Sequence, residues 1–104
     1  MEHGVAVLVL TGRLVFGRDA QGLEDFVRNS LKIGQKRFVF DATALEYVDS
    51  SGIGALVSSL NEITKAGGDL RVAGANSRLQ RRFTTTGVDR LLVQCSSVAE
   101  ATSR

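Results

Sequence analysis

The chain has 104 residues, a formal net charge of +2, and only one Cys and one His. Its length predicts a single domain over residues 1–104, and 43% hydrophobic with 23% charged residues is an ordinary globular composition. The small charge gives no reason to expect a nucleic-acid partner. Cys95 alone cannot form an internal disulfide or a Cys-rich zinc site, and we expect neither a metal ion nor a cofactor.

The sequence indicates neither a membrane-spanning nor an exported protein. The longest stretch without a charged residue, Ser50–Asn61, is far shorter than the roughly 20 apolar residues that span a bilayer. Met1–Gly4 lacks the basic region with which a secretory signal begins. We therefore expect a cytoplasmic protein that does not insert into a membrane.

Strand and helix signals alternate along the first half of the chain. The β-branched apolar run Val5–Leu10 predicts a strand that is buried on both faces. Asp19 can cap a helix that Gly34 ends. Arg37–Phe40 predicts a second strand, and Ala42–Val48 is predicted to be a short connection with one turn.

The alternation continues through the second half. From Ser51 onward, apolar residues recur at helical spacing until Gly67 ends the pattern. Leu70–Ala73 and Leu91–Val93 predict two further strands with a helix between them, and a small helix completes the chain. Strict alternation of this kind predicts an α/β fold with a largely parallel sheet.

Three arginines, Arg78, Arg81 and Arg82, share one face of the third predicted helix. A basic face of this kind is usually solvated. An acidic or phosphate-bearing partner is the alternative interpretation.

The loop that ends in Asp49, Ser50 and Ser51 lies where the best-predicted helix begins. Partner and ligand sites in open α/β sheets gather at this edge, and the start of a helix favours a negative group. Gly52 and Gly54 remove side chains that would crowd an approaching group. A phosphate on a serine would be stabilised by the helix but repelled by the neighbouring Asp. Simple capping of the helix by any of the three residues is the alternative explanation.

The segment Val48–Leu56, with the sequence Val-Asp-Ser-Ser-Gly-Ile-Gly-Ala-Leu, resembles the signature of STAS domains, the family of the anti-sigma factor antagonists. The similarity extends over nearly the whole chain and includes the turn Gly12-Arg13-Leu14 and the segment Leu70–Gly74. This resemblance implies a mixed, mostly parallel sheet of four to five strands with about four helices.

The resemblance also implies a role in transcription regulation by partner switching. The unphosphorylated antagonist binds an anti-sigma factor that is also a serine kinase, and this frees the sigma factor. The kinase then phosphorylates the first serine of the motif, here Ser50, and the complex dissociates. A separate serine phosphatase resets the switch. The chain is then a binding module and a kinase substrate, and we do not expect it to be an enzyme.

Within this resemblance, Asp49 and Ser51 flank the acceptor serine, and Gly52 and Gly54 belong to the same loop. Leu45 and Ile53 flank that loop, and we expect them to make apolar contacts with the partner. Many antagonists have an acidic residue after the Gly-x-Leu turn, where this chain has Val15-Phe16. Many relatives also begin with an extra strand. Because Met1–Gly4 is too short to supply one, we expect an uncovered sheet edge that favours a homodimer.

Two alternatives remain open. The chain could be an accessory STAS subunit of a membrane transporter or a sensory complex that is not phosphorylated. It could also be a small enzyme or nucleotide binder, because Gly52-x-Gly54 opens a helix. The Lys of a phosphate-binding P-loop and a usable catalytic His are both missing from this pattern, which argues against that alternative.

Overall fold

The computed structural model describes residues 4–103, which form one four-stranded sheet and four α-helices. The strands lie in the order of the sequence, and every pairing is parallel. They are β1 (Val5–Leu14), β2 (Arg37–Val48), β3 (Asp69–Ala73) and β4 (Val93–Cys95). The α-helices are α1 (Arg18–Lys32), α2 (Ser50–Lys65), α3 (Ser77–Thr86) and α4 (Val98–Thr102), and a 3-10 helix spans Val88–Arg90. The predicted α/β class is confirmed. Residues 1–3, for which no strand is predicted, lie outside the described residues.

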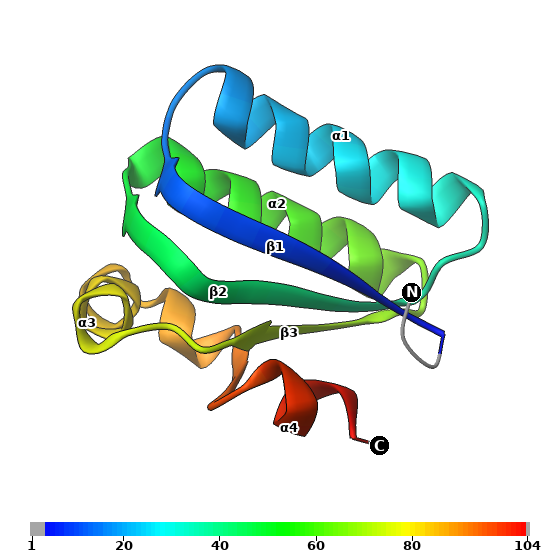
Figure 1. Ribbon diagram of the computed structural model, residues 1–104. Helices are drawn as coiled ribbons and strands as arrows, with labels where there is room; N and C mark the ends of the chain where they lie inside the picture. Colours follow the sequence, from blue (N-terminus) through cyan, green and yellow to red (C-terminus); the bar gives the residue numbers. More distant parts are fainter. Residues whose placement is uncertain (1–3, 104) are drawn as a thin grey trace.

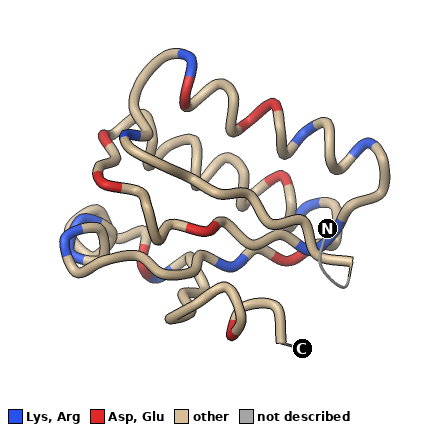
Figure 2. The backbone as a smooth tube through the Cα atoms, viewed as in Figure 1, with Lys and Arg blue, Asp and Glu red and all other residues tan. Residues whose placement is uncertain are grey.

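One face of the sheet is covered by α1 and α2, which lie side by side along it (Figure 1). α3 lies beyond the end of β3, and its charged positions include several of the basic residues marked in Figure 2. Both α3 and the start of α2 lie near the carboxyl end of β2. This brings a basic helix close to the loop that the sequence singles out.

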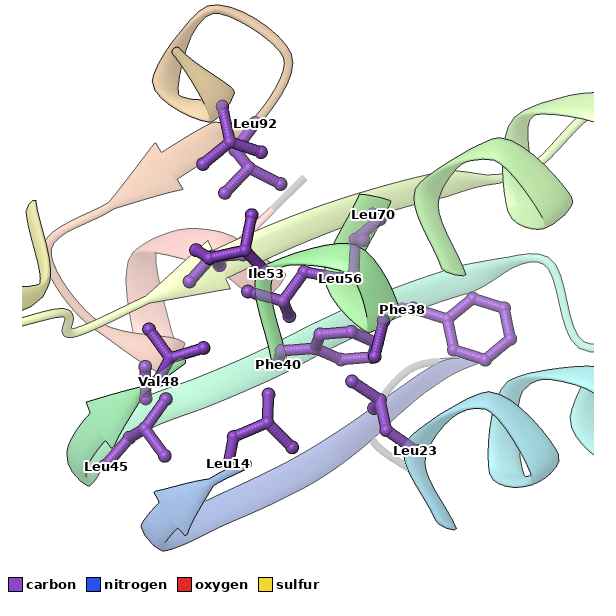
Figure 3. Close-up of a cluster of buried hydrophobic side chains, with 14 of the residues drawn as sticks. Leu14, Leu23, Phe38, Phe40, Leu45, Val48, Ile53, Leu56, Leu70 and Leu92 are labelled. Carbon is purple, nitrogen blue, oxygen red and sulfur yellow. The ribbon is translucent and has the colours of Figure 1, made fainter. Parts of the chain in front are cut away.

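The main core lies between the sheet and these three helices. Phe38 and Phe40 of β2 point into it and meet Leu23 of α1 and Leu56 of α2 (Figure 3). α3 contributes Leu79 and Phe83 to the same cluster. The large apolar side chains on one face of β2 therefore hold all three helices in place.

The opposite face of the sheet has a smaller apolar cluster beneath α4 (Figure 1). It joins Val5, Val39 and Ala73 of the three longer strands to Ala101 of α4. Val39 thus points away from its neighbours Phe38 and Phe40, as the two-residue period of a strand requires. Over Phe38–Phe40, β2 is buried on both faces, and its sequence there is a continuous apolar run.

The prediction that residues 42–48 form a connection is wrong, because β2 continues to Val48. Its buried residues there, Ala42, Leu45 and Val48, are spaced by three, so the two-residue pattern of a strand is absent. Register shifts between β1 and β2 accommodate this spacing, and one of them follows Gly12, whose φ is +65°. β1 is correspondingly longer than predicted.

Two smaller predictions also need correction. The N-cap of α1 is Gly17 and not Asp19, which lies in the first turn of the helix. The last strand covers Val93–Cys95, because the 3-10 helix and the turn after it include Leu91. Both shifts are of two residues and leave the order of the elements unchanged.

Candidate functional site

The carboxylate of Asp49 joins the start of α2 to the loop that follows β1. Its Oδ1 accepts a hydrogen bond of 2.8 Å from the backbone amide of Gly52, which makes Asp49 the N-cap of α2. Its Oδ2 accepts a bond of 3.1 Å from the amide of Phe16. The backbone amide of Asp49 donates to the carbonyl oxygen of Leu14 at 3.2 Å. One residue thus fixes two segments that are about thirty residues apart.

These contacts keep Asp49 ionised. The hydrogen bond from Gly52 is the largest of the causes that lower the pKa of Asp49, followed by the bond from Phe16. Partial desolvation acts in the opposite direction, while the amide of Ser51 and the positive charge of Arg82 lower the pKa further. The N-cap is therefore an anion at neutral pH, which is the favourable charge for the start of a helix.

Ser50 is the first residue of α2, and its side chain is exposed. Because Asp49 supplies the cap, the capping role that the sequence left open among three residues does not fall to Ser50 or Ser51. Within residues 4–103 the hydroxyl of Ser50 has no hydrogen-bond partner, and Ser51 is partly buried. The exposed hydroxyl is accessible to another protein.

The two glycines of the motif have different structural roles. A Cβ atom at Gly52 would lie 2.2 Å from the carbonyl oxygen of Leu14 and 2.5 Å from Cγ2 of Val48, so the residue is required for close packing. A Cβ atom at Gly54 would meet nothing within 4 Å. Only Gly54 matches the expectation of open space, because the end of β1 and the side chain of Val48 occupy the space next to Gly52.

The expected partner contacts Leu45 and Ile53 are corrected by the structure. Their side chains are 2% and 9% exposed and belong to the main core (Figure 3). The apolar side chain that is exposed beside the motif is Phe16, with 81% of its surface accessible. Phe16 and the start of α1 line a shallow hollow together with Ser51 and Gly54. An aromatic residue in a strand-to-helix loop was the available sequence signal for this exposed side chain.

The described residues contain no group of three or more His, Cys, Asp and Glu side chains that could hold a metal ion. Among the helices of residues 4–103, none combines the length and the apolar character needed to cross a bilayer.

Comparisons with known proteins agree on one family. The sequence model of the STAS domain matches residues 2–101. No curated protein matches the chain. Solved structures do, among them a candidate anti-sigma factor antagonist from Thermotoga maritima, with a TM-score of 0.90 and 22% identity over 99% of this chain and 88% of that one.

Two further solved structures have the same fold. The STAS domain of a SulP transporter from Vibrio cholerae has a TM-score of 0.80 and 21% identity, covering 97% of this chain and 80% of that one. The phosphorylated form of the Bacillus cell fate determinant SpoIIAA has a TM-score of 0.77 and 17% identity, covering 100% of this chain and 93% of that one. At these identities the likeness establishes the fold.

Proposed function

Because the chain belongs to the STAS domain family, we propose that it is an anti-sigma factor antagonist, which binds an anti-sigma factor serine kinase while unphosphorylated and is released when Ser50 is phosphorylated. The observation that carries the proposal is the exposed Ser50 hydroxyl, which has no partner within residues 4–103 while Asp49 caps the helix. In this role the unphosphorylated protein binds an anti-sigma factor serine kinase in the cytoplasm. The chain supplies a binding surface and an acceptor hydroxyl, and the kinase supplies the catalysis.

The proposed covalent step is phosphoryl transfer from Mg-ATP held by the kinase. The Ser50 oxygen forms a bond to the γ-phosphorus, the bond from that phosphorus to the bridging oxygen of ADP breaks, and ADP leaves. The hydroxyl proton passes to a base of the kinase or to solvent. A serine phosphatase later hydrolyses the phosphate ester and restores the hydroxyl.

Release of the partner follows from charge. Phosphorylation adds about −1.5 to −2 charges at the first residue of α2. Asp49 is already ionised beside it, so the new dianion creates repulsion within a surface that fits the kinase. Loss of a buried, charge-assisted contact costs roughly 2–5 kcal/mol of binding free energy, which is enough to separate a complex.

Mass spectrometry tests this proposal. The protein is incubated with Mg-ATP and each of a panel of anti-sigma factor serine kinases, and the phosphorylated residue is mapped. We expect one phosphoryl group on Ser50 and none on Ser50→Ala. Absence of phosphate with every kinase, or phosphate that persists on the Ala variant, would contradict the proposal.

One observation favours a second candidate function. Phe16 occupies the region where many antagonists carry an acidic residue, so the surface beside Ser50 is more apolar. A STAS subunit that docks permanently on a transporter or a sensory complex would use such a surface without phosphorylation. The same kinase panel distinguishes the two, because a docking subunit would remain unmodified.

A further inference from the structure

A small hollow lies between α3 and the carboxyl end of β2, close to the proposed switch loop. Its volume is about 260 Å³. Arg78, Arg81 and Arg82 of α3 line it together with Tyr47 and Val48 of β2. Val48 is two residues before Ser50, so the hollow continues the surface on which the switch is proposed.

The arginines of this hollow form no ion pair in the part of the chain that the structure describes. Among residues 4–103, none of the three has a carboxylate within 4 Å of its guanidinium. The Nε atom of Arg82 is buried and has no hydrogen-bond partner in the described part of the chain. A buried donor without a partner is a cost that the folded protein already carries, and a ligand reaches Arg82 only through the guanidinium nitrogens that are not buried.

The charged side chains around the hollow give it a net positive charge, which favours binding of an anion. Glu46 is the one acidic residue that lines the hollow, and Asp49 is close enough for its pKa to be lowered by Arg82. On the other side, the guanidinium of Arg13 lies over the ring of Tyr47, 4.8 Å from its centroid, and adds a fourth cation. Basic positions on α3 and acidic positions near the end of β2 are both visible in Figure 2. Cations exceed anions around the hollow by two.

We propose that this hollow receives an acidic side chain, Asp or Glu, of the protein partner that binds the Ser50 loop. A guanidinium matches a carboxylate with two parallel hydrogen bonds. The ring of Tyr47, which is 39% exposed, offers apolar surface to the carbon atoms of that side chain. At about 260 Å³ the hollow is smaller than the roughly 300–1,000 Å³ typical of sites for whole small molecules. This inference rests on the proposed function for the identity of the partner.

The first test needs no partner protein and therefore does not depend on the switch. The full chain, labelled with ¹⁵N, is titrated with the blocked tripeptide acetyl-Glu-Leu-Glu-amide, and the Nε–H resonances of the arginines are followed by NMR. We expect a saturable shift of the Arg82 resonance, and an affinity about tenfold or more weaker for acetyl-Gln-Leu-Gln-amide. Arg28, which is paired with Asp25 on α1, should not respond.

Two further arms define the outcomes of this titration. Inorganic phosphate should bind more weakly than the acidic peptide, because it has no carbon atoms to pack against the exposed ring of Tyr47. The variants Arg82→Gln and Arg81→Gln should each weaken peptide binding, while Arg28→Gln should not. The second of these variants changes an exposed residue and keeps the test valid if the first unfolds. A shift that does not saturate, equal binding of the neutral peptide, or equal binding of phosphate would overturn the proposal.

A second test uses the kinase that phosphorylates Ser50. We expect Arg82→Gln to weaken the unphosphorylated complex about tenfold or more, with Arg28→Gln as the matched control. Unchanged affinity would overturn the docking role even if Ser50 is phosphorylated. Absence of phosphorylation would contradict the proposed function but leave the peptide titration as an independent measurement.

Discussion

The backbone amide of Phe16 donates a hydrogen bond of 3.1 Å to Oδ2 of Asp49, across 33 residues of sequence. The other carboxylate oxygen caps α2 through Gly52, so the exposed aromatic side chain and the exposed Ser50 are held by a single anion. This contact explains how the Phe16 loop and the Ser50 hydroxyl form one surface. It also makes Asp49 a positioning residue whose loss should affect both the fold and the partner.

The first prediction concerns pH and the Asp49→Asn variant. The folded pKa of Asp49 is lowered, so its stabilising contribution is fully present above the unfolded value and is lost as the pH falls through the folded value. The variant should be less stable than the parent at pH 7, and the difference should shrink below about pH 4. Urea unfolding between pH 2 and 7 measures it.

Glu100 also makes the stability depend on pH, and the design of this experiment has to cancel its effect. Its pKa is lowered by hydrogen bonds from the amide and the hydroxyl of Ser96, so the parent protein loses a second contribution in acid. The comparison of parent and Asp49→Asn cancels that contribution. A difference in unfolding free energy that stays constant from pH 7 to pH 2 would show that the charge of Asp49 does not support the fold.

The second prediction uses the two glycines of the motif as a matched pair. Gly52→Ala forces a methyl group against the Leu14 carbonyl and Val48, and it should lower the unfolding free energy by about 1–3 kcal/mol. Gly54→Ala meets open space on the helix and should raise stability by about 0.5–1 kcal/mol. Thermal and urea unfolding report both values. Equal effects of the two variants would be inconsistent with the close packing described for Gly52.

The third prediction concerns the exposed ring of Phe16. Phe16→Ser should change stability by less than about 0.5 kcal/mol, because the side chain is 81% exposed, but it should weaken kinase binding about tenfold. Ile33→Ser is the control, since Ile33 is 85% exposed at the opposite end of α1. Calorimetric titration of both variants with the kinase provides the measurement. Equal loss of affinity in the two variants would show that Phe16 makes no specific contribution to kinase binding.

The fourth prediction concerns the outer edge of the sheet. β1 pairs with β2 on one side, and no strand among residues 4–103 pairs with its other side. Val9 near the middle of this edge is 58% exposed. We propose that two copies associate through β1, and that Val9→Lys shifts the equilibrium toward the monomer, because a charged residue on an edge strand disfavours pairing. Sedimentation over a range of concentrations measures this, and a parent protein that stays monomeric throughout would exclude the dimer.

The order of the elements could be predicted from the sequence because apolar spacing and glycines report local structure directly. α2 shows this best, since its buried residues Ile53, Leu56 and Ile63 repeat at helical intervals. The second half of β2 could not be predicted, because Leu45 and Val48 lie three residues apart and become strand residues only through the irregular pairing with β1. A local pattern of apolar residues carries no information about pairing between strands that are distant in the sequence.

The candidate site was predictable only in part for the same reason. Ser50 and Asp49 are contiguous in the motif, and the sequence places both at the start of a helix. Besides Gly52, the partners of Asp49 are Leu14 at the end of β1 and Phe16 in the loop after it, and the hollow beside Asp49 requires α3. These contacts depend on how distant segments pack. The expectation for Leu45 failed because its apolar character suits a core and an interface equally.

The central claim is that phosphorylation of Ser50 releases the kinase, and one binding measurement tests it most directly. Complexes of the kinase with the parent protein, Ser50→Ala and Ser50→Asp are followed before and after Mg-ATP is added. The account predicts that Mg-ATP dissociates the parent complex, that the Ala variant stays bound, and that the Asp variant binds weakly from the start. Parallel binding and release by all three proteins would contradict it.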